Sequence, residues 1–294
     1  MSLQRLPYFL AVADHGSFVS AAKALHMTQP ALSNQIHALE REVGVELFYR
    51  SARGASPTAA GLALLPEARL LLERFGQATS LVRRVGLGEA GRLAIGLVPT
   101  AANSQLPVFI RRFMAEFPDV ELSLAEQRPA VLVEQLRSGA LDLVIQYQPV
   151  GGDIVDIRIA QERLVLAVPS GHPLASQPIA SVTDLHGMPL ILPAAHGSAG
   201  ILRRITLLLK EHNVEAKVVQ ADIWLMQTIV GLVSAGIGLA IVPESAAVIR
   251  ADQVSYLPLA DRGATVELYA NHRAENNEPT VHRFVTMLTA PRAD

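Results

Sequence analysis

A predicted helix between Gln29 and Val43 carries short polar side chains on one face. Gln29, Ser33 and Asn34 lie together there, and His37 follows one turn after Ser33. Amide and hydroxyl groups of this size can pair with base edges in the major groove of DNA, and an imidazole can approach a phosphate. The pattern therefore indicates a helix that reads DNA or, as the alternative, an ordinary solvated helix face.

Two arginines follow this helix within a stretch rich in Gly, Ser and Pro. A short β-prone run begins after Gly44, and the turn behind it carries Arg50 and Arg53. Guanidinium groups on such a turn can bind phosphate or enter a minor groove. We expect both arginines to position the protein on DNA more than to select a sequence.

Short helices must hold these groups in place. Gly16 ends a first helix, and Ser17 is a suitable N-cap for an alanine-rich second one. Thr28 caps the third helix, which has Pro30 in its first turn. An apolar stripe on the third helix, with spacings of 4, 3 and 4, is formed by Leu32, Ile36, Leu39 and Val43. The small second helix lets this stripe pack closely, so the polar face points outward.

The sequence contains none of the common catalytic signatures. There is no GxxxxGK[ST] phosphate loop, no HExxH and no GxSxG, and the GIG at 236–238 precedes a predicted strand. The nine histidines include no pair at i, i+4, and the absence of cysteine excludes disulfides and thiolate metal sites. We therefore expect neither catalysis nor a metal or cofactor. An enzyme with an unrecognised site is the alternative.

Composition and charge describe a folded chain with an uneven charge distribution. Of 294 residues, 50% are hydrophobic and 18% are charged, which argues against disorder. Residues 1–86 hold nine Lys and Arg against six Asp and Glu, whereas the rest of the chain has an acidic excess. No signal peptide or membrane span is recognisable. These features favour a cytoplasmic protein whose first part can bind DNA.

A long helical pattern follows Thr58 and continues to about residue 85. Its apolar positions are spaced 3, 4, 3, 4 and 3, namely Leu65, Ala68, Leu72, Phe75, Thr79 and Val82. This heptad-like seam is typical of paired helices, although an amphipathic helix on its own domain would share the spacing. Pro66 predicts a bend or a restart, and the Gly-rich stretch 86–91 predicts a flexible break.

Strands and helices alternate from Arg92 onward. Strands are predicted at 92–98, 120–126, 141–147, 163–169, 189–194, 216–221, 236–243 and 264–270, with helices near 106–117, 129–139, 199–212 and 224–235. The alternation predicts an α/β fold with mostly parallel strands, arranged in two small sheets. A ligand would bind where strands end and helices begin.

The stretch from Phe18 to Glu40 resembles the helix-turn-helix of LysR-type transcriptional regulators. The matching residues there are Phe18, Ala21, Ala22, Leu25, the run 29–33, Gln35, Ile36, Leu39 and Glu40. The wing and the linker helix match at Gly44, Leu47, Phe48, Arg50, Arg53, Thr58 and Gly61. The resemblance continues through the chain at Arg92, Leu93, Gly96, 113–118, 139–142, 172–174 and 235–243.

The resemblance implies a fold in three parts. A winged helix-turn-helix would occupy residues 1–58, a linker and dimerisation helix 59–86, and an effector-binding domain 87–294. This last domain would resemble periplasmic binding proteins, with Rossmann-like subdomain I at about 92–161 and 266–294 and subdomain II at about 162–265. The implied partners are double-stranded promoter DNA, a small-molecule effector, further copies of the chain in a dimer of dimers, and RNA polymerase, with no membrane.

The resemblance also assigns residues to the DNA contact. These are Phe18, Thr28, Gln29, Pro30, Ser33, Asn34, His37, Arg50 and Arg53. The family often has a basic residue near positions 34 and 37, where this chain has Asn and His. Phosphate attraction would then be weaker here and sensitive to pH.

Effector sites in the family lie between the two subdomains. Carried over by position, the site would comprise Thr100, Ala101, Asn103, Ser104, Arg128, Pro129, Gln146, Tyr147, His196, Ser198, Gly200 and Trp224. Helix N-termini, hydroxyls, an arginine and a histidine would suit a small anionic metabolite. A periplasmic-type solute-binding protein is the alternative for this half of the chain. The DNA-binding motif and the lack of a recognisable signal peptide argue against it.

Overall fold

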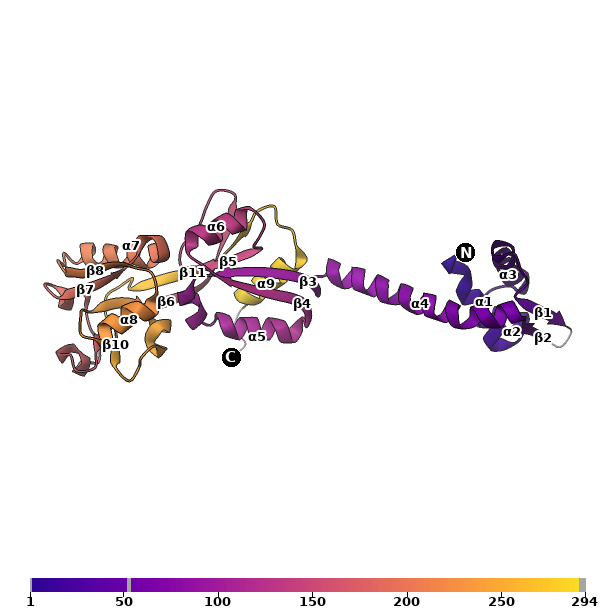
Figure 1. The fold of residues 1–294 in the computed structure, drawn as a ribbon, viewed down its shortest axis with the longest axis horizontal. Coiled ribbons are helices and arrows are strands. Elements are labelled where there is room, and N and C mark those ends of the chain that lie inside the picture. The colour runs from indigo at the N-terminus through magenta and orange to yellow at the C-terminus, as the bar shows by residue number, and fades with distance from the viewer. Residues whose placement is uncertain (1, 52–53, 291–294) are drawn as a thin grey trace. The chain divides into compact units, whose positions relative to one another are not determined.

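The computed structural model describes residues 2–51 and 54–290, without the side chains of residues 196–199. The chain divides into two compact units, residues 1–84 and residues 85–294. Helices and one small hairpin form the first unit, and the second combines strands with helices (Figure 1). Arg53, expected in the wing, lies outside the described residues.

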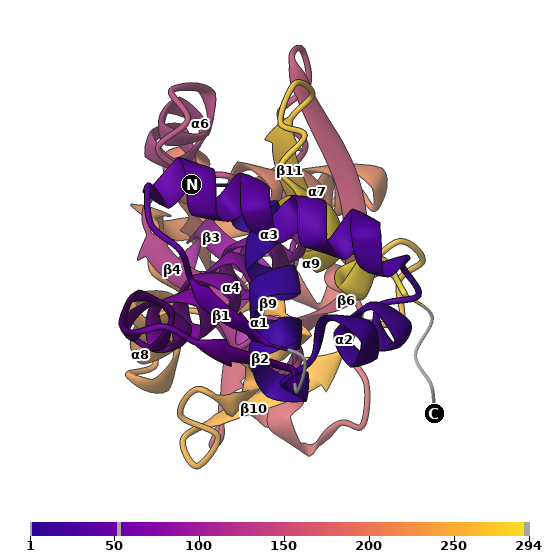
Figure 2. The ribbon, with the colours of Figure 1, turned by 90° about the vertical axis from the view of Figure 1, so that its right-hand side faces the viewer.

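The first unit is a helical domain with a hairpin and a long final helix. Its elements are η1 (Leu3–Arg5), α1 (Leu6–His15), α2 (Phe18–Ala24), α3 (Gln29–Val43), β1 (Phe48–Ser51), β2 (Gly54–Pro57) and α4 (Ala59–Gly86). Helix α1 contacts both α2 and β2, as Figure 2 also shows from the end of this unit.

Local capping chemistry sets the helix ends as the sequence predicts. Gly16 adopts a left-handed φ of 61° after α1, and Gly44 does the same at 78° after α3. The side chain of Ser17 accepts a hydrogen bond from the backbone of α2, and that of Thr28 accepts one from Ala31. The predicted stripe on α3 faces the core, where Leu32, Ile36 and Leu39 are fully buried.

The stretch 54–57 is a strand, although its Gly, Ser and Pro content predicts a turn. It pairs antiparallel with β1, with Phe48 opposite Pro57. The backbone of Ala55 donates to the carbonyl of Gly16 at 2.8 Å, and a Cβ at Gly54 would lie 2.5 Å from that same oxygen. Contact with the end of α1 therefore holds this segment extended and overrides its local preference.

Helix α4 runs through Pro66 without interruption, so the predicted restart is wrong. Thr58 begins the helix by accepting a hydrogen bond from Gly61 at 3.0 Å. Pro66 has no N–H for the carbonyl of Leu62, one turn earlier. Both residues are exposed, with Leu62 at 59%, so water can satisfy that carbonyl. The helix therefore tolerates the missing bond.

The apolar seam of α4 divides into two halves. Ala68 is fully buried, and Leu65 and Leu72 pack partly against the winged domain. Further along, Phe75 is 54% exposed and Val82 is 72% exposed. The first half thus behaves as an amphipathic helix on its own domain, whereas the second half leaves large apolar side chains in solvent.

The second unit contains two subdomains that share long strands. The first has β3 (Ala90–Leu97), η2 (Pro99–Asn103), α5 (Leu106–Glu116), β4 (Asp119–Glu126), α6 (Pro129–Arg137), β5 (Leu143–Gln146) and α9 (Pro279–Thr289). The second has η3 (Pro173–Ser176), η4 (Val182–Leu185), β7 (Pro189–Pro193), α7 (Ala195–Glu211), β8 (Lys217–Ile223), α8 (Met226–Ser234), β9 (Ala240–Pro243), η5 (Glu244–Val248) and β10 (Val254–Pro258). Strands β6 (Ile154–Pro169) and β11 (Thr265–Arg273) run between them.

Strand β6 belongs to both subdomains, which makes one continuous sheet. The order is β10-β6-β11-β5-β3-β4, with β9 also on β6, while β7 and β8 form a separate pair. From Ile154 to Arg163 β6 pairs with β11, and from Leu164 onward it pairs with β9 and β10. The expected pair of small separate sheets is therefore wrong, because a single strand links both halves.

The expectation of mostly parallel strands is also wrong. The pairs β3–β4, β3–β5 and β7–β8 are parallel, as βαβ units require. The pairs β5–β11, β6–β11, β6–β9 and β6–β10 are antiparallel. The crossing strands β6 and β11 account for the difference.

Helix α9 and strand β10 complete the unit without having been predicted. Helix α9 buries Phe284, whose ring meets that of Phe113 edge-on at 5.1 Å. The start of α9 also fixes part of the supposedly flexible stretch 86–91. Gly88 has a φ of 69°, and a Cβ there would lie 2.6 Å from the backbone of Pro279. The stretch is therefore packed from Gly88 onward.

No helix in the ranges 2–51 and 54–290 has both the length and the apolar character needed to cross a membrane.

The contact between α4 and the wing can be tested at Gly61. A Cβ there would lie 2.2 Å from the carbonyl oxygen of Leu47, so α4 would have to move. We expect Gly61→Ala to lower the free energy of unfolding by about 1–3 kcal/mol in denaturant titrations of the full chain. Gly76→Ala on the same helix, with no atom within 4 Å of the added Cβ, is the control. It should raise stability by about 0.5–1 kcal/mol, and equal effects would contradict the close contact.

Candidate nucleic-acid interface and ligand-binding cleft

The outer face of α3 presents the predicted DNA-reading side chains to solvent. Gln29, Pro30 and Asn34 are exposed, and Ser33 is half-buried beside them. Thr28 is also exposed while its hydroxyl caps the helix, which leaves its methyl group outward. The opposite face is locked into the core, so these polar groups are held on a rigid element.

Arg50 joins the wing to this helix. Its Nη1 donates to the hydroxyl of Ser33 at 2.8 Å, and its Nη2 lies 3.4 Å from Nδ1 of His37. Its guanidinium carbon also lies 4.5 Å from the ring centroid of Phe18. Arg50 therefore links β1 to α3 in this structure, and its contact with DNA stays a prediction.

Glu40 supplies the countercharge and was not anticipated from the sequence. Its carboxylate is buried, and Oε1 accepts the backbone N–H of Leu47 at 2.9 Å. Oε2 lies 3.3 Å from Nδ1 of His37 and 3.7 Å from Arg50. The i, i+3 spacing to His37 lies within α3, whereas Leu47 and Arg50 reach Glu40 from beyond the end of that helix, and that part of its role was not predicted.

Phe18 acts in this structure through packing. Its ring meets that of Phe48 edge-on at 5.9 Å, and Arg50 covers one of its faces. The ring of Phe18 thus packs between the guanidinium of Arg50 on one side and the buried ring of Phe48 on another.

The predicted effector residues lie around the contact between the two subdomains. Thr100 and Ala101 are buried in η2, and Tyr147 is buried just beyond β5. A Cβ at Gly200 would lie 1.7 Å from the carbonyl oxygen of Tyr147, so α7 packs directly on the end of β5. Arg128 lies 5.1 Å over the ring of Trp224 from the other subdomain. The two subdomains are therefore in direct contact at these residues.

The predicted loop after β7 is instead the first part of α7. His196, Ser198 and Gly200 all fall within this helix, which begins at Ala195. The side chains of His196 and Ser198 lie outside the described part of the structure. Pro129 is the first residue of α6 and is buried. Arg128, which precedes α6, contacts Trp224, and Gly200 of α7 contacts Tyr147, so both helices begin near the contact between the subdomains.

Gln146, at the end of β5, has a polar side chain that is buried without hydrogen-bond partners among the described residues. This holds for both Oε1 and Nε2, and the side chain is fully buried. Alternation along β5 places it on the same sheet face as Val144, which packs near Gly96 beneath α6. An amide buried without partners is costly, which points to a binding role.

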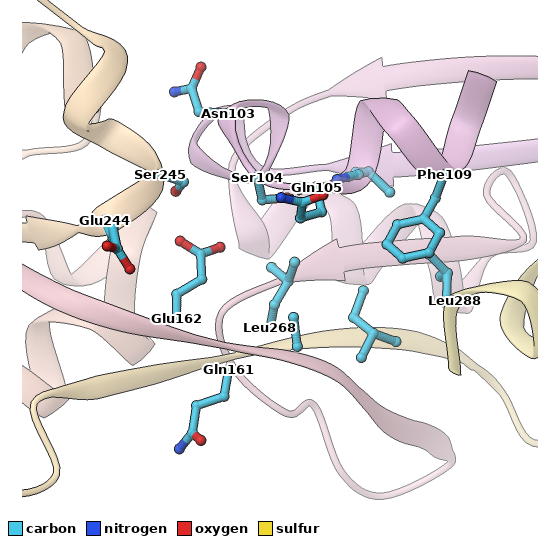
Figure 3. A pocket seen from close by; sticks show the side chains of 13 residues that line it. Asn103, Ser104, Gln105, Phe109, Gln161, Glu162, Glu244, Ser245, Leu268 and Leu288 are labelled. Atoms are coloured by element: carbon cyan, nitrogen blue, oxygen red, sulfur yellow. Dashed lines mark hydrogen bonds between the residues drawn. The ribbon is translucent and has the colours of Figure 1, made fainter. Parts of the chain in front are cut away.

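Asn103 and Ser104, by contrast, line a separate cavity of about 350 Å³ (Figure 3). It lies over β6, between η2 and η5, and Glu162 reaches into it. The hydroxyl of Tyr147 donates to Oε1 of Glu162 at 2.8 Å. Burial, together with the charge of Glu162, holds the pKa of Tyr147 well above its usual value, so this donor stays protonated. The predicted effector set is thus split between two places.

Comparisons with known proteins bear on both units. Residues 3–62 match the bacterial regulatory helix-turn-helix protein of the lysR family, and residues 86–291 match the LysR substrate binding domain. The chain is 35% identical to the HTH-type transcriptional regulator AlsR of Bacillus subtilis, covering 97% of this chain and 94% of that protein. Identity to the HTH-type transcriptional regulator TfdS of Cupriavidus pinatubonensis is 32%, covering 97% of each.

Solved structures give the same result. The crystal structure of CbnR, a LysR family transcriptional regulator, matches with a TM-score of 0.87 at 30% identity, covering 98% of this chain and all of that one. Full-length CbnR complexed with its target DNA matches with a TM-score of 0.82 at 30% identity, covering 98% of both chains.

The organising role of Arg50 predicts that lysine cannot replace it. Arg50→Lys keeps the charge but loses the two guanidinium nitrogens that contact Ser33 and His37, and it loses the stacking on Phe18. We expect an unfolding free energy lower by about 1 kcal/mol in calorimetry of the full chain, with the salt dependence of DNA binding unchanged. Arg41→Lys, on an exposed position of the same helix, should have no effect. Identical stabilities for both variants would contradict the role assigned to Arg50.

Proposed function

Because the chain belongs to the LysR family of DNA-binding transcriptional regulators, we propose that α3 and the wing read a promoter site while a small effector acts on the second unit. The observation that carries this proposal is the exposed polar face of α3, held rigid by its buried stripe and by Arg50. Gln29, Ser33 and Asn34 would contact base edges, and Arg53 would contact phosphate. His37, beside Glu40, would add a phosphate contact.

We propose that the protein assembles as a dimer of dimers. Each unit contributes one apolar surface that its own chain leaves uncovered. On α4 this surface contains Phe75, Leu81 and Val82, which are 53–72% exposed. In the second unit, an apolar groove of about 500 Å³ between α5 and the end strand β4 includes Met114 and Leu124. Two independent surfaces support an assembly larger than a dimer.

Action on promoter DNA would place this assembly in the cytoplasm and next to RNA polymerase, which we propose as a further partner. A symmetric dimer presents two copies of α3 to one face of the duplex, so the operator would have dyad-related half-sites.

We place the effector in the cleft around Gln146. Helices α6 and α7 contact each other, Gly200 of α7 lies against the backbone of Tyr147, and helix N-termini favour negative charge. The buried amide of Gln146 needs a donor for Oε1 and an acceptor for Nε2. A small anion with a neighbouring hydroxyl or N–H group, such as a hydroxy acid, would satisfy both requirements. Binding would shift the equilibrium between open and closed subdomains by its preference for one of them.

DNA reading by α3 can be tested at Asn34. If its amide contacts one base, Asn34→Ala should weaken binding to the preferred operator by about 1–3 kcal/mol. Binding to random duplex should stay the same, because the phosphate contacts remain. Electrophoretic mobility shifts on both duplexes measure this difference. The exposed Asn277 of the second unit gives the control Asn277→Ala. Equal losses on both duplexes would exclude a specific contact.

The role of Gln146 predicts opposite effects on stability and on ligand binding. Gln146→Leu removes a buried amide that has no partner among the described residues, so the free protein should gain about 1–3 kcal/mol of unfolding free energy. The same change should abolish the stabilisation that an effector found by thermal-shift screening gives to the parent chain. Gln220→Leu, at an exposed position of β8, should do neither. A destabilised Gln146→Leu variant would show that the amide is already bonded.

A further inference from the structure

We propose that the cavity between η2 and η5 binds an organic cation, with an ammonium or amidinium head and a short apolar body. This ligand would differ in charge from the effector placed in the cleft, and its site lies on other residues. Three features support this proposal: the cavity itself, the negative charge of its lining, and the separation of a polar end from an apolar end.

The cavity is a built space that both subdomains enclose. Its volume of about 350 Å³ falls within the usual range for small-molecule sites. Residues of η2 and α5 line one side, Glu244 and Ser245 of η5 line another, and residues 159–162 of β6 form its floor. Figure 3 shows η2 and η5 approaching the same space from different sides.

The electrostatics of the lining select for positive charge. Glu162 and Glu244 are the charged lining residues, and no Lys, Arg or His of the described chain lines the cavity. Ionised carboxylates accept hydrogen bonds and cannot donate them. An ammonium would meet complementary charge here, whereas a carboxylate ligand would meet repulsion.

Glu162 supplies the most specific observation. Its Oε1 accepts from Tyr147, while Oε2 is buried and has no partner among the described residues. Figure 3 shows this carboxylate pointing into the space bordered by Ser104 and Ser245. Ser104 cannot serve it, because its hydroxyl donates to the carbonyl of Ala101 at 2.7 Å. The hydroxyl of Ser245, which borders the same space, is also buried without a partner among the described residues. A ligand head in this space would therefore meet a carboxylate acceptor beside a hydroxyl group.

The far end of the cavity is apolar. Phe109 and Leu288 lie together there, away from the carboxylates, and Leu268 continues the same wall (Figure 3). A cation with an aromatic or short alkyl body would place that body against Phe109 while its head reaches Glu162. A hydrated inorganic cation has no apolar part that could pack against Phe109 and Leu288.

Binding in this cavity would act on the whole second unit. The ligand would touch η2 from one subdomain and η5 from the other, so its affinity would depend on their relative position. A ligand that prefers one arrangement shifts the population toward it. The cation would thus modulate the response to the cleft effector without competing for its residues.

The test uses three probes of the same shape and different charge. Benzylamine, benzyl alcohol and benzoate are titrated into the full chain and followed by calorimetry and ligand-observed NMR, with hexylamine as an alkyl analogue. We expect an amine to bind, the alcohol to bind about tenfold or more weakly, and benzoate not to compete for the amine's place. Equal binding of alcohol and amine, competition by benzoate, or no binding by either amine would overturn the proposal.

Variants of Glu162 and Glu244 test whether the amine binds in this cavity. Glu162→Gln keeps the shape and an acceptor for Tyr147, and should weaken the amine by roughly 10- to 150-fold. Glu121→Gln, at an exposed position of β4, is the matched control and should leave the amine affinity unchanged. If Glu162→Gln does not fold, Glu244→Gln carries the same test. Unchanged amine affinity in the folded variant would overturn the assignment of this site.

Discussion

The regulatory unit depends on one covalent constraint, namely that β6 is a single strand shared by both subdomains. Its first ten residues pair with β11, and its remaining residues pair with β9 and β10. Neither subdomain can move without bending or twisting this strand and its partner β11. The proposed effector site at Gln146 and the cavity at Glu162 both lie near residues where the subdomains are in contact. A small molecule in either place would therefore act on the same conformational equilibrium.

The DNA-binding unit obeys a similar constraint through a buried carboxylate. Glu40 holds the backbone of Leu47 and also lies beside His37 and Arg50, so it ties α3 to the start of the wing. A buried carboxylate is tolerated when it has partners, and the backbone of Leu47 and the guanidinium of Arg50 supply them here. Glu40 thus links α3 to the start of the hairpin, which would help to hold the proposed reading face in a fixed geometry.

The sequence predicts local structure better than it predicts what meets across the fold. Gly16, Ser17, Thr28 and the stripe on α3 act as predicted, because capping and periodicity are properties of neighbouring residues. Spacing does not reveal strand direction, so the antiparallel crossing of β6 and β11 was missed. It also could not show that Asn103 and Ser104 face one cavity while Gln146 is buried elsewhere. The roles of Glu40 and Glu162 depend on contacts with Arg50 and Tyr147, which lie on other elements of the fold.

We propose that two symmetric copies of α3 bind DNA together in the dimer. The most direct measurement is selection of duplexes from a random pool by the full chain, followed by sequencing. Our account predicts enrichment of dyad-related half-sites whose centres are about one helical turn, or a multiple of it, apart. Enrichment of single asymmetric half-sites, or no enrichment at all, would contradict it.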